Sequence, residues 1–127
     1  QISFIFDPTV FIPAPAQGAL GIQTRADDAE TNKIIAAIDD RTARTTTDAE
    51  RTILTTMQCG CHAPVGAYAK ITGDEIDIRA FISQPQGENF IRRHVTGPAG
   101  QAIKLAEQIA HELLNAGGKE ILASLEN

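Results

Sequence analysis

The run Cys59-Gly60-Cys61-His62 holds the side chains best suited to chemistry in this sequence. Thiols and imidazoles bind metals, exchange disulfides and act as nucleophile and base. A zinc site is disfavoured, because there is no second cysteine pair and His94 and His111 do not supply zinc-finger spacing. A redox pair normally has two residues between its cysteines, and adjacency is no evidence for a Cys-His dyad, since such pairs meet in space. Taken alone, the run favours small buried thiols that follow a helix.

Several other polar residues have simpler interpretations than a functional site. Arg92-Arg93 could grip a carboxylate, but a solvated strand edge is the favoured interpretation. Asp27 and Asp28 are better explained as helix caps than as metal ligands. Glu50 is also expected to cap a helix, with Arg51 paired locally. The sequence therefore predicts no metal site.

The composition is typical of a globular protein that binds neither nucleic acid nor membrane. Of 127 residues (13.6 kDa), 43% are apolar and 21% are charged, which suits one ordinary domain or two small ones. The net charge of −5 disfavours a phosphate-backbone partner. No apolar run approaches the ~18 residues of a membrane-spanning helix, and no signal peptide is expected.

The cysteines and the first residue indicate the setting of the chain. Two cysteines so close together cannot form a disulfide framework, so a reduced, cytoplasmic environment is expected. The sequence begins with Gln1 rather than Met, and we expect it to be a piece of a longer protein.

After the cysteine motif, the hydrophobic period becomes two and predicts a sheet. Apolar residues alternate with others over 65–71 and 76–82, with a hairpin turn at Gly73-Asp74. A turn at Pro85-Gln86-Gly87 leads to a third strand over 89–96. A helical apolar stripe over 102–113 should cover one face, and Gly117-Gly118 precedes a last short helix. The predicted fold class is α+β, with a three-stranded antiparallel sheet covered by helices on one face.

The first part of the chain predicts elements without a sheet of their own. Residues 1–15 read as an extended connector, with at most a short edge strand near Val10–Ile12. The run Gly18–Thr24 reads as a buried strand. A helix should follow, capped by Asp27 and Glu30, with its apolar face formed by Ile34, Ile35 and Ile38.

A second helix is predicted between this part and the sheet. Thr47 and Glu50 match a capping box, and Ile53, Leu54 and Met57 follow at helical spacing. Gly60 is the expected residue after its C-terminus. The predicted division is therefore 1–45, a returning connector, strand and helix that belong to an upstream domain, and 46–127, a small α+β domain. An isolated strand needs partners, which we expect in a missing part of the protein or in another chain.

Two stretches of the chain resemble porphobilinogen deaminases, also called hydroxymethylbilane synthases. The run Pro13–Ile22, followed by Arg25, resembles the PAPGQGALGIExR segment of that family, with Ala16 in place of a Gly and Gln23 in place of a Glu. The runs 49–51 and 59–68 resemble its AER and G-G-C-x-x-P-[IV]-G-A-Y motifs. The likeness covers roughly residues 12–125, which is nearly the whole chain.

The resemblance implies the C-terminal part of a three-domain transferase of heme biosynthesis. Such enzymes polymerise four porphobilinogen molecules into hydroxymethylbilane. A dipyrromethane cofactor is bound through a thioether to the motif cysteine, which is Cys61 here, while Cys59 stands where the family usually has Gly. The resemblance also places Gln17 and Gly18 beside the cofactor. It places the catalytic aspartate and most substrate-binding arginines in the missing N-terminal domains, so this chain would hold no catalytic residue and be inactive alone. The full-length protein is expected to be a monomer.

Two alternative hypotheses belong to other functional classes. The chain could be a small protein-interaction module with structural thiols, using the polar face of the sheet formed by Tyr68, Lys70, Asp77 and Arg79. A metal-binding C-x-C-H site would need further ligands and ranks last.

Overall fold

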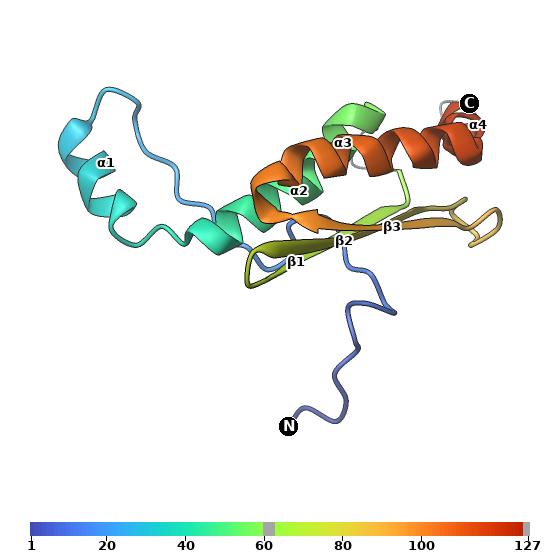
Figure 1. Ribbon diagram of the computed structural model, residues 1–127, viewed down its shortest axis with the longest axis horizontal. Helices are drawn as coiled ribbons and strands as arrows, with labels where there is room; N and C mark the ends of the chain where they lie inside the picture. Colours follow the sequence, from blue (N-terminus) through green and yellow to red (C-terminus); the bar gives the residue numbers. More distant parts are fainter. Residues whose placement is uncertain (60–62, 126–127) are drawn as a thin grey trace.

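The fold is a small sheet with helices on one side (Figure 1). The structure is a computed structural model and describes residues 1–59 and 63–125. Its elements are α1 (Ala29–Ala36), α2 (Arg41–Met57), β1 (Val65–Thr72), β2 (Glu75–Ile82), β3 (Ile91–Pro98), α3 (Ala102–Leu113) and α4 (Lys119–Leu125). The strands form one antiparallel sheet in the order β1-β2-β3. Within the described ranges no helix is both long and apolar enough to cross a bilayer.

Both predicted turns of the sheet are present. Thr72 pairs with Glu75 across a two-residue hairpin at which Gly73 has φ 61°, a conformation that glycine adopts at little cost. The second turn is closed by hydrogen bonds between Gln84 and Glu88 and between Gly87 and Gln84. The resulting register places Ile82 between Val65 and Ile91. The meander predicted from the two-residue period is thus confirmed.

The core lies between one face of the sheet and the helices α2 and α3. Alternate residues of the strands point inward, and they meet the apolar stripe of α3 and the inner face of α2. The largest fully buried side chains are Ile53, Ile76, Ile78, Ile82, Ile109 and Leu113. Figure 1 shows the helices on one side of the sheet and the N-terminal segment on the other. The predicted α+β class, with helices on one face, is confirmed.

The outer face of the sheet carries the polar residues that its alternation predicted. Asp77 on β2 accepts hydrogen bonds from Arg79 at 2.8 Å and lies 2.6 Å from the His94 ring nitrogen. Partial burial alone would raise the pKa of Asp77, but the bonds from Arg79 and His94 outweigh it and lower that pKa below its ordinary value. The outer face therefore carries a local ion-pair network at its centre and, further along β2, the stacked rings of Phe81 and Phe90.

The first part of the chain differs from the prediction in three places. Residues 18–24 form no strand, because none of the strands in the described part of the chain supplies hydrogen-bond partners for them. A turn closed by bonds from Val10 and Phe11 to Asp7 stands where a short edge strand was allowed. The helix α1 forms, but its cap is Asp28, which accepts from the Thr31 amide at 3.0 Å, rather than Asp27. Its apolar face is not buried, and Ile34 remains 64% exposed.

The start of α2 also differs from the prediction. The helix begins six residues before the predicted capping box, because Asp40 accepts from the Ala43 amide at 2.9 Å and caps it. Thr47 and Glu50 therefore lie in the middle of the helix. At its other end Gln58 adopts the left-handed conformation, with φ 52°. Gly60, predicted to follow the C-terminus, lies outside the described residues.

Gly66 on β1 provides a test of the sheet. It pairs with Phe81, and a Cβ at this position would overlap the Phe81 ring, which is itself stacked on Phe90. Gly66→Ala in the intact protein is expected to lower the free energy of unfolding by about 1–3 kcal/mol, because the ring must move. Gly100→Ala is the matched control, because its Cβ would meet nothing within 4 Å. Denaturant unfolding checks both, and equal effects would contradict the predicted overlap.

Candidate functional site

The cysteine motif joins the end of α2 to the start of β1. Cys61, together with Gly60 and His62, lies outside the described residues. Its described neighbours, Cys59 and Ala63, both pack against the hydrophobic core. The motif is therefore bounded on each side by residues fixed to the α+β core.

The Cys59 thiol is in a poor position to act as a nucleophile. It is half-buried, and its Sγ lies 3.7 Å from the Leu54 carbonyl oxygen, to which it donates. Burial raises the pKa of this thiol, and a backbone hydrogen bond opposes the rise only in part. Because the thiolate is the reactive form, this burial disfavours Cys59 as a nucleophile. It matches the small buried thiol that the sequence predicted after this helix.

Gln17 and Gly18 lie in an exposed tight turn. The backbone amide of Gln17 donates to the Ala14 carbonyl at 3.1 Å, and the side-chain Oε1 of Gln17 accepts from the backbone amide of Ala14 at 3.2 Å. The side chain is thereby folded over its own turn, which leaves its NH₂ group as the donor suited to a ligand. Gly18 has φ 84° and open space where a Cβ would be. A ligand could therefore approach this backbone closely.

The turn is attached to the free edge of β1. The Ala67 amide donates to the Pro13 carbonyl at 3.1 Å. Two residues along, the Ala69 amide donates to a Glu50 carboxylate oxygen at 2.7 Å, and the other oxygen accepts from the Ala16 amide at 2.6 Å. The Ala67 and Ala69 amides at the edge of β1 are thus occupied by the turn and by α2, which protects this part of the edge.

Glu50 is a functional candidate that sequence reasoning assigned wrongly. It does not cap a helix; it is only 8% exposed on the inner side of α2 and joins residues far apart in the chain. Burial raises its pKa, and the hydrogen bonds from Ala69 and Ala16 partly oppose that rise. Its spacing from Ile53 and Met57 was the available signal, because it places a carboxylate on the apolar face of the helix.

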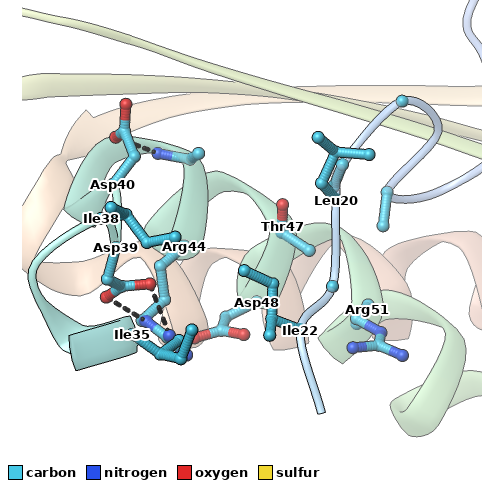
Figure 2. Close-up of a pocket in the computed structure, with 15 residues that line it drawn as sticks. Leu20, Ile22, Ile35, Ile38, Asp39, Asp40, Arg44, Thr47, Asp48 and Arg51 are labelled. Atoms are coloured by element: carbon cyan, nitrogen blue, oxygen red, sulfur yellow. Dashed lines mark hydrogen bonds and ion pairs between the residues drawn. The ribbon is translucent and has the colours of Figure 1, made fainter. Parts of the chain in front are cut away.

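Two hollows flank this region. A cavity of about 260 Å³ is lined by Gln17, Glu50 and Tyr68 among others. A wider one, of about 730 Å³, lies between residues 18–22 and α2 (Figure 2). Figure 2 shows Leu20 and Ile22 on one wall and the bidentate Asp39–Arg44 pair on another. Leu20 is 97% exposed, so this wall of the hollow is apolar and uncovered.

The remaining candidates form no common site in the described part of the chain. Arg92 donates to the Thr9 carbonyl and Arg93 to the Arg92 carbonyl, so neither is seen to grip a carboxylate. His94 belongs to the Asp77 network, while His111 is exposed at the end of α3. Among the described residues no three potential metal-ligating side chains come together.

The family of the chain follows from comparison with known proteins. Residues 44–115 match the family model described as "Porphobilinogen deaminase, C-terminal domain". The chain belongs to the porphobilinogen deaminase family. A porphobilinogen deaminase of Exiguobacterium sp. (strain ATCC BAA-1283 / AT1b) is 42% identical over 120 residues, which is 94% of this chain and 38% of the relative. The chain therefore spans little more than a third of this curated porphobilinogen deaminase.

The region matched to the porphobilinogen deaminase domain contains most of the candidate site. It includes Glu50, both cysteines and the whole sheet, together with α3. Gln17 and Gly18 precede it. The contact of Ala16 with Glu50 therefore joins the matched domain to the segment before it.

Ala16 provides a test of the turn. It adopts φ 60°, a left-handed conformation that costs a residue with a Cβ about 1 kcal/mol. Ala16→Gly in the intact protein is expected to raise the free energy of unfolding by about 0.5–1 kcal/mol. The nearby exposed Ala19, whose φ is not positive, is the control. Ala19→Gly should slightly lower the free energy of unfolding, because glycine gives the unfolded chain more conformational freedom. Thermal unfolding distinguishes them, and destabilisation by Ala16→Gly would contradict the expectation.

Proposed function

We propose that the chain is the C-terminal part of a transferase that polymerises four porphobilinogen molecules into hydroxymethylbilane for heme biosynthesis. The observation that carries this proposal is the match of residues 44–115 to the C-terminal domain of porphobilinogen deaminases. Porphobilinogen is then the substrate of the full-length enzyme, and the missing N-terminal domains are the partners of this chain. The proposed division is a returning segment, 1–45, and a cofactor-attachment domain, 46–127.

Cys61 is the proposed attachment point of a dipyrromethane cofactor. A thiolate can add to the electrophilic methylene left when a porphobilinogen loses ammonia, so that an S–C bond forms and does not hydrolyse. When bound, the dipyrromethane supplies the primer for the growing pyrrole chain. The burial that disfavours Cys59 as a nucleophile supports the assignment to Cys61, as does the Pro64-Val65-Gly66 sequence that follows it.

The described residues fit one side of such a ligand. Gln17 offers an exposed amide donor, and Gly18 leaves room for close approach. The chain carries only 11 basic residues, which form no cluster in the sequence, and Arg44 and Arg79 are already paired with Asp39 and Asp77. We therefore assign Gln17 and Gly18 to cofactor binding and expect the missing domains to supply most of the cations.

The attachment is tested by intact mass and peptide mapping of the full-length protein. The expected result is a dipyrromethane-sized adduct on Cys61, with Cys59 unmodified. Cys61→Ala should remove the adduct and reduce hydroxymethylbilane formation to background, whereas the matched Cys59→Ala should retain both. An adduct on Cys59 would contradict the assignment. A freely exchanging Cys61 without an adduct in the full-length protein would favour an interaction module instead.

Residues 1–127 alone are expected to be inactive. The proposed catalytic aspartate and most substrate-binding arginines lie in the missing domains, and the chain itself carries only 11 basic residues. Incubation of the isolated chain with porphobilinogen, beside the full-length enzyme as control, should give no hydroxymethylbilane. Turnover by the isolated chain would overturn the proposed division of labour.

A further inference from the structure

Glu50 is a buried carboxylate whose two oxygens serve two different parts of the chain. One accepts from Ala69 on β1 at 2.7 Å and the other from Ala16 in the turn at 2.6 Å. The sequence separations are 19 and 34 residues, so both contacts are tertiary. Hydrogen bonds to a charged acceptor are stronger than neutral ones. A single side chain therefore fastens the turn, the helix and the strand to one another.

At its position on α2 the Glu50 carboxylate is buried, and burying its charge would destabilise the fold if the Ala16 and Ala69 amides did not bind it. It shares the inner face of α2 with Ile53 and Met57, which are at most 3% exposed. Among the described residues no cationic group lies within 4 Å of it to balance its charge. A carboxylate buried without a cation depends on hydrogen-bond donors. The Ala16 and Ala69 amides meet that requirement.

The turn fixed by this contact carries Gln17. Ala16 is bonded to Glu50 through its amide, and the next peptide bond leads directly to Gln17. Gln17 and Glu50 also line the same cavity of about 260 Å³. Loss of the Glu50 contact would free the Ala16 amide and the backbone that orients the Gln17 side chain. Glu50 can therefore influence a ligand of Gln17 through the single peptide bond between Ala16 and Gln17.

We propose that Glu50 is a positioning residue, which holds the Ala16–Gln17 backbone against β1 so that Gln17 presents its amide to the pyrrole ligand. The inference rests on the role proposed above for Gln17. Glu50 would touch neither the substrate nor the cofactor, and would act only through the turn. Without it, the part of the chain before α2 loses its charge-assisted contact with the cofactor-attachment domain and keeps the bond from Ala67 to Pro13.

Arg44 provides a matched control on the same helix. Residues 17–39 form a segment that begins beside the Ala16–Glu50 contact and ends beside Arg44. Arg44 forms a bidentate pair with Asp39 at 2.6 and 2.9 Å. The Arg44 side chain is 62% exposed, so its ion pair is screened by solvent. Arg44→Ala removes a polar contact at the C-terminal end of the segment 17–39 and leaves the turn at Ala16–Gln17 unchanged.

The experiment combines hydrogen exchange with a double-mutant cycle in the full-length, cofactor-loaded enzyme. Glu50→Gln keeps the shape of the side chain but removes the charge that strengthens both bonds, and it faces one of the two amides with an NH₂ group, so that both contacts weaken. Exchange at the Ala16 amide should accelerate about tenfold or more, and kcat/KM for porphobilinogen should fall about tenfold. In a Gln17→Ala background the same substitution should lower kcat/KM less than about twofold, because the positioned group is already gone. Arg44→Ala should change none of these quantities.

The outcomes separate positioning from a merely structural role. Additive losses of kcat/KM for Glu50→Gln and Gln17→Ala, or unchanged exchange at Ala16, would overturn the proposal. A Gln17→Ala enzyme with normal kcat/KM would also overturn it. None of these results would affect the proposed function, which depends on the adduct at Cys61 and on turnover by the unmutated enzyme. If Glu50→Gln does not fold, Glu50→Asp, which keeps the charge but cannot span both amides, is tested against the same outcomes.

Discussion

The arrangement of this chain depends on one buried carboxylate that has no cation within 4 Å among the described residues. Glu50 sits where α2 meets β1, and its charge is balanced by the backbone amides of Ala16 and Ala69. Amide donors have fixed positions, so the side chain can be accommodated only if the strand and the turn are both in place. The turn, the edge of β1 and the helix are therefore one cooperative unit. The apolar core stabilises the fold, and this polar contact, together with the hydrogen bond from Ala67 to Pro13, holds the N-terminal segment against it.

Much of the C-terminal half could be predicted from the sequence because its signals are local. Residues at a period of two are bounded by turns that contain Gly73 and Gly87, and both glycines adopt positive φ. The stripe on α3 continues for three turns and ends just before the glycines at 117 and 118. Each element there agrees with its neighbours, so local propensity and tertiary packing favour the same structure.

The errors arose where two local signals competed or where the deciding partner was distant. Asp40 and Thr47 are both suitable N-caps, and the Glu three residues after Thr47 favoured the wrong one. That Glu meets Ala16, 34 residues away, which no capping rule could indicate. The apolar run after Gly18 has strand-like character, but a strand needs a partner, and the described residues provide none for it. The cysteine assignment came from family resemblance, since the residues alone favoured buried thiols.

The length of α2 has a mechanical consequence. Its 17 residues make a rod of about 25 Å. The two ends of the segment 17–39 are held along the first ten residues of α2, by Glu50 and Arg44. The cysteine motif follows the far end of α2. Close-packed interiors have low compressibility and transmit strain. A displacement at Arg44 or Glu50 would therefore be transmitted along α2 to Cys59, just beyond its far end.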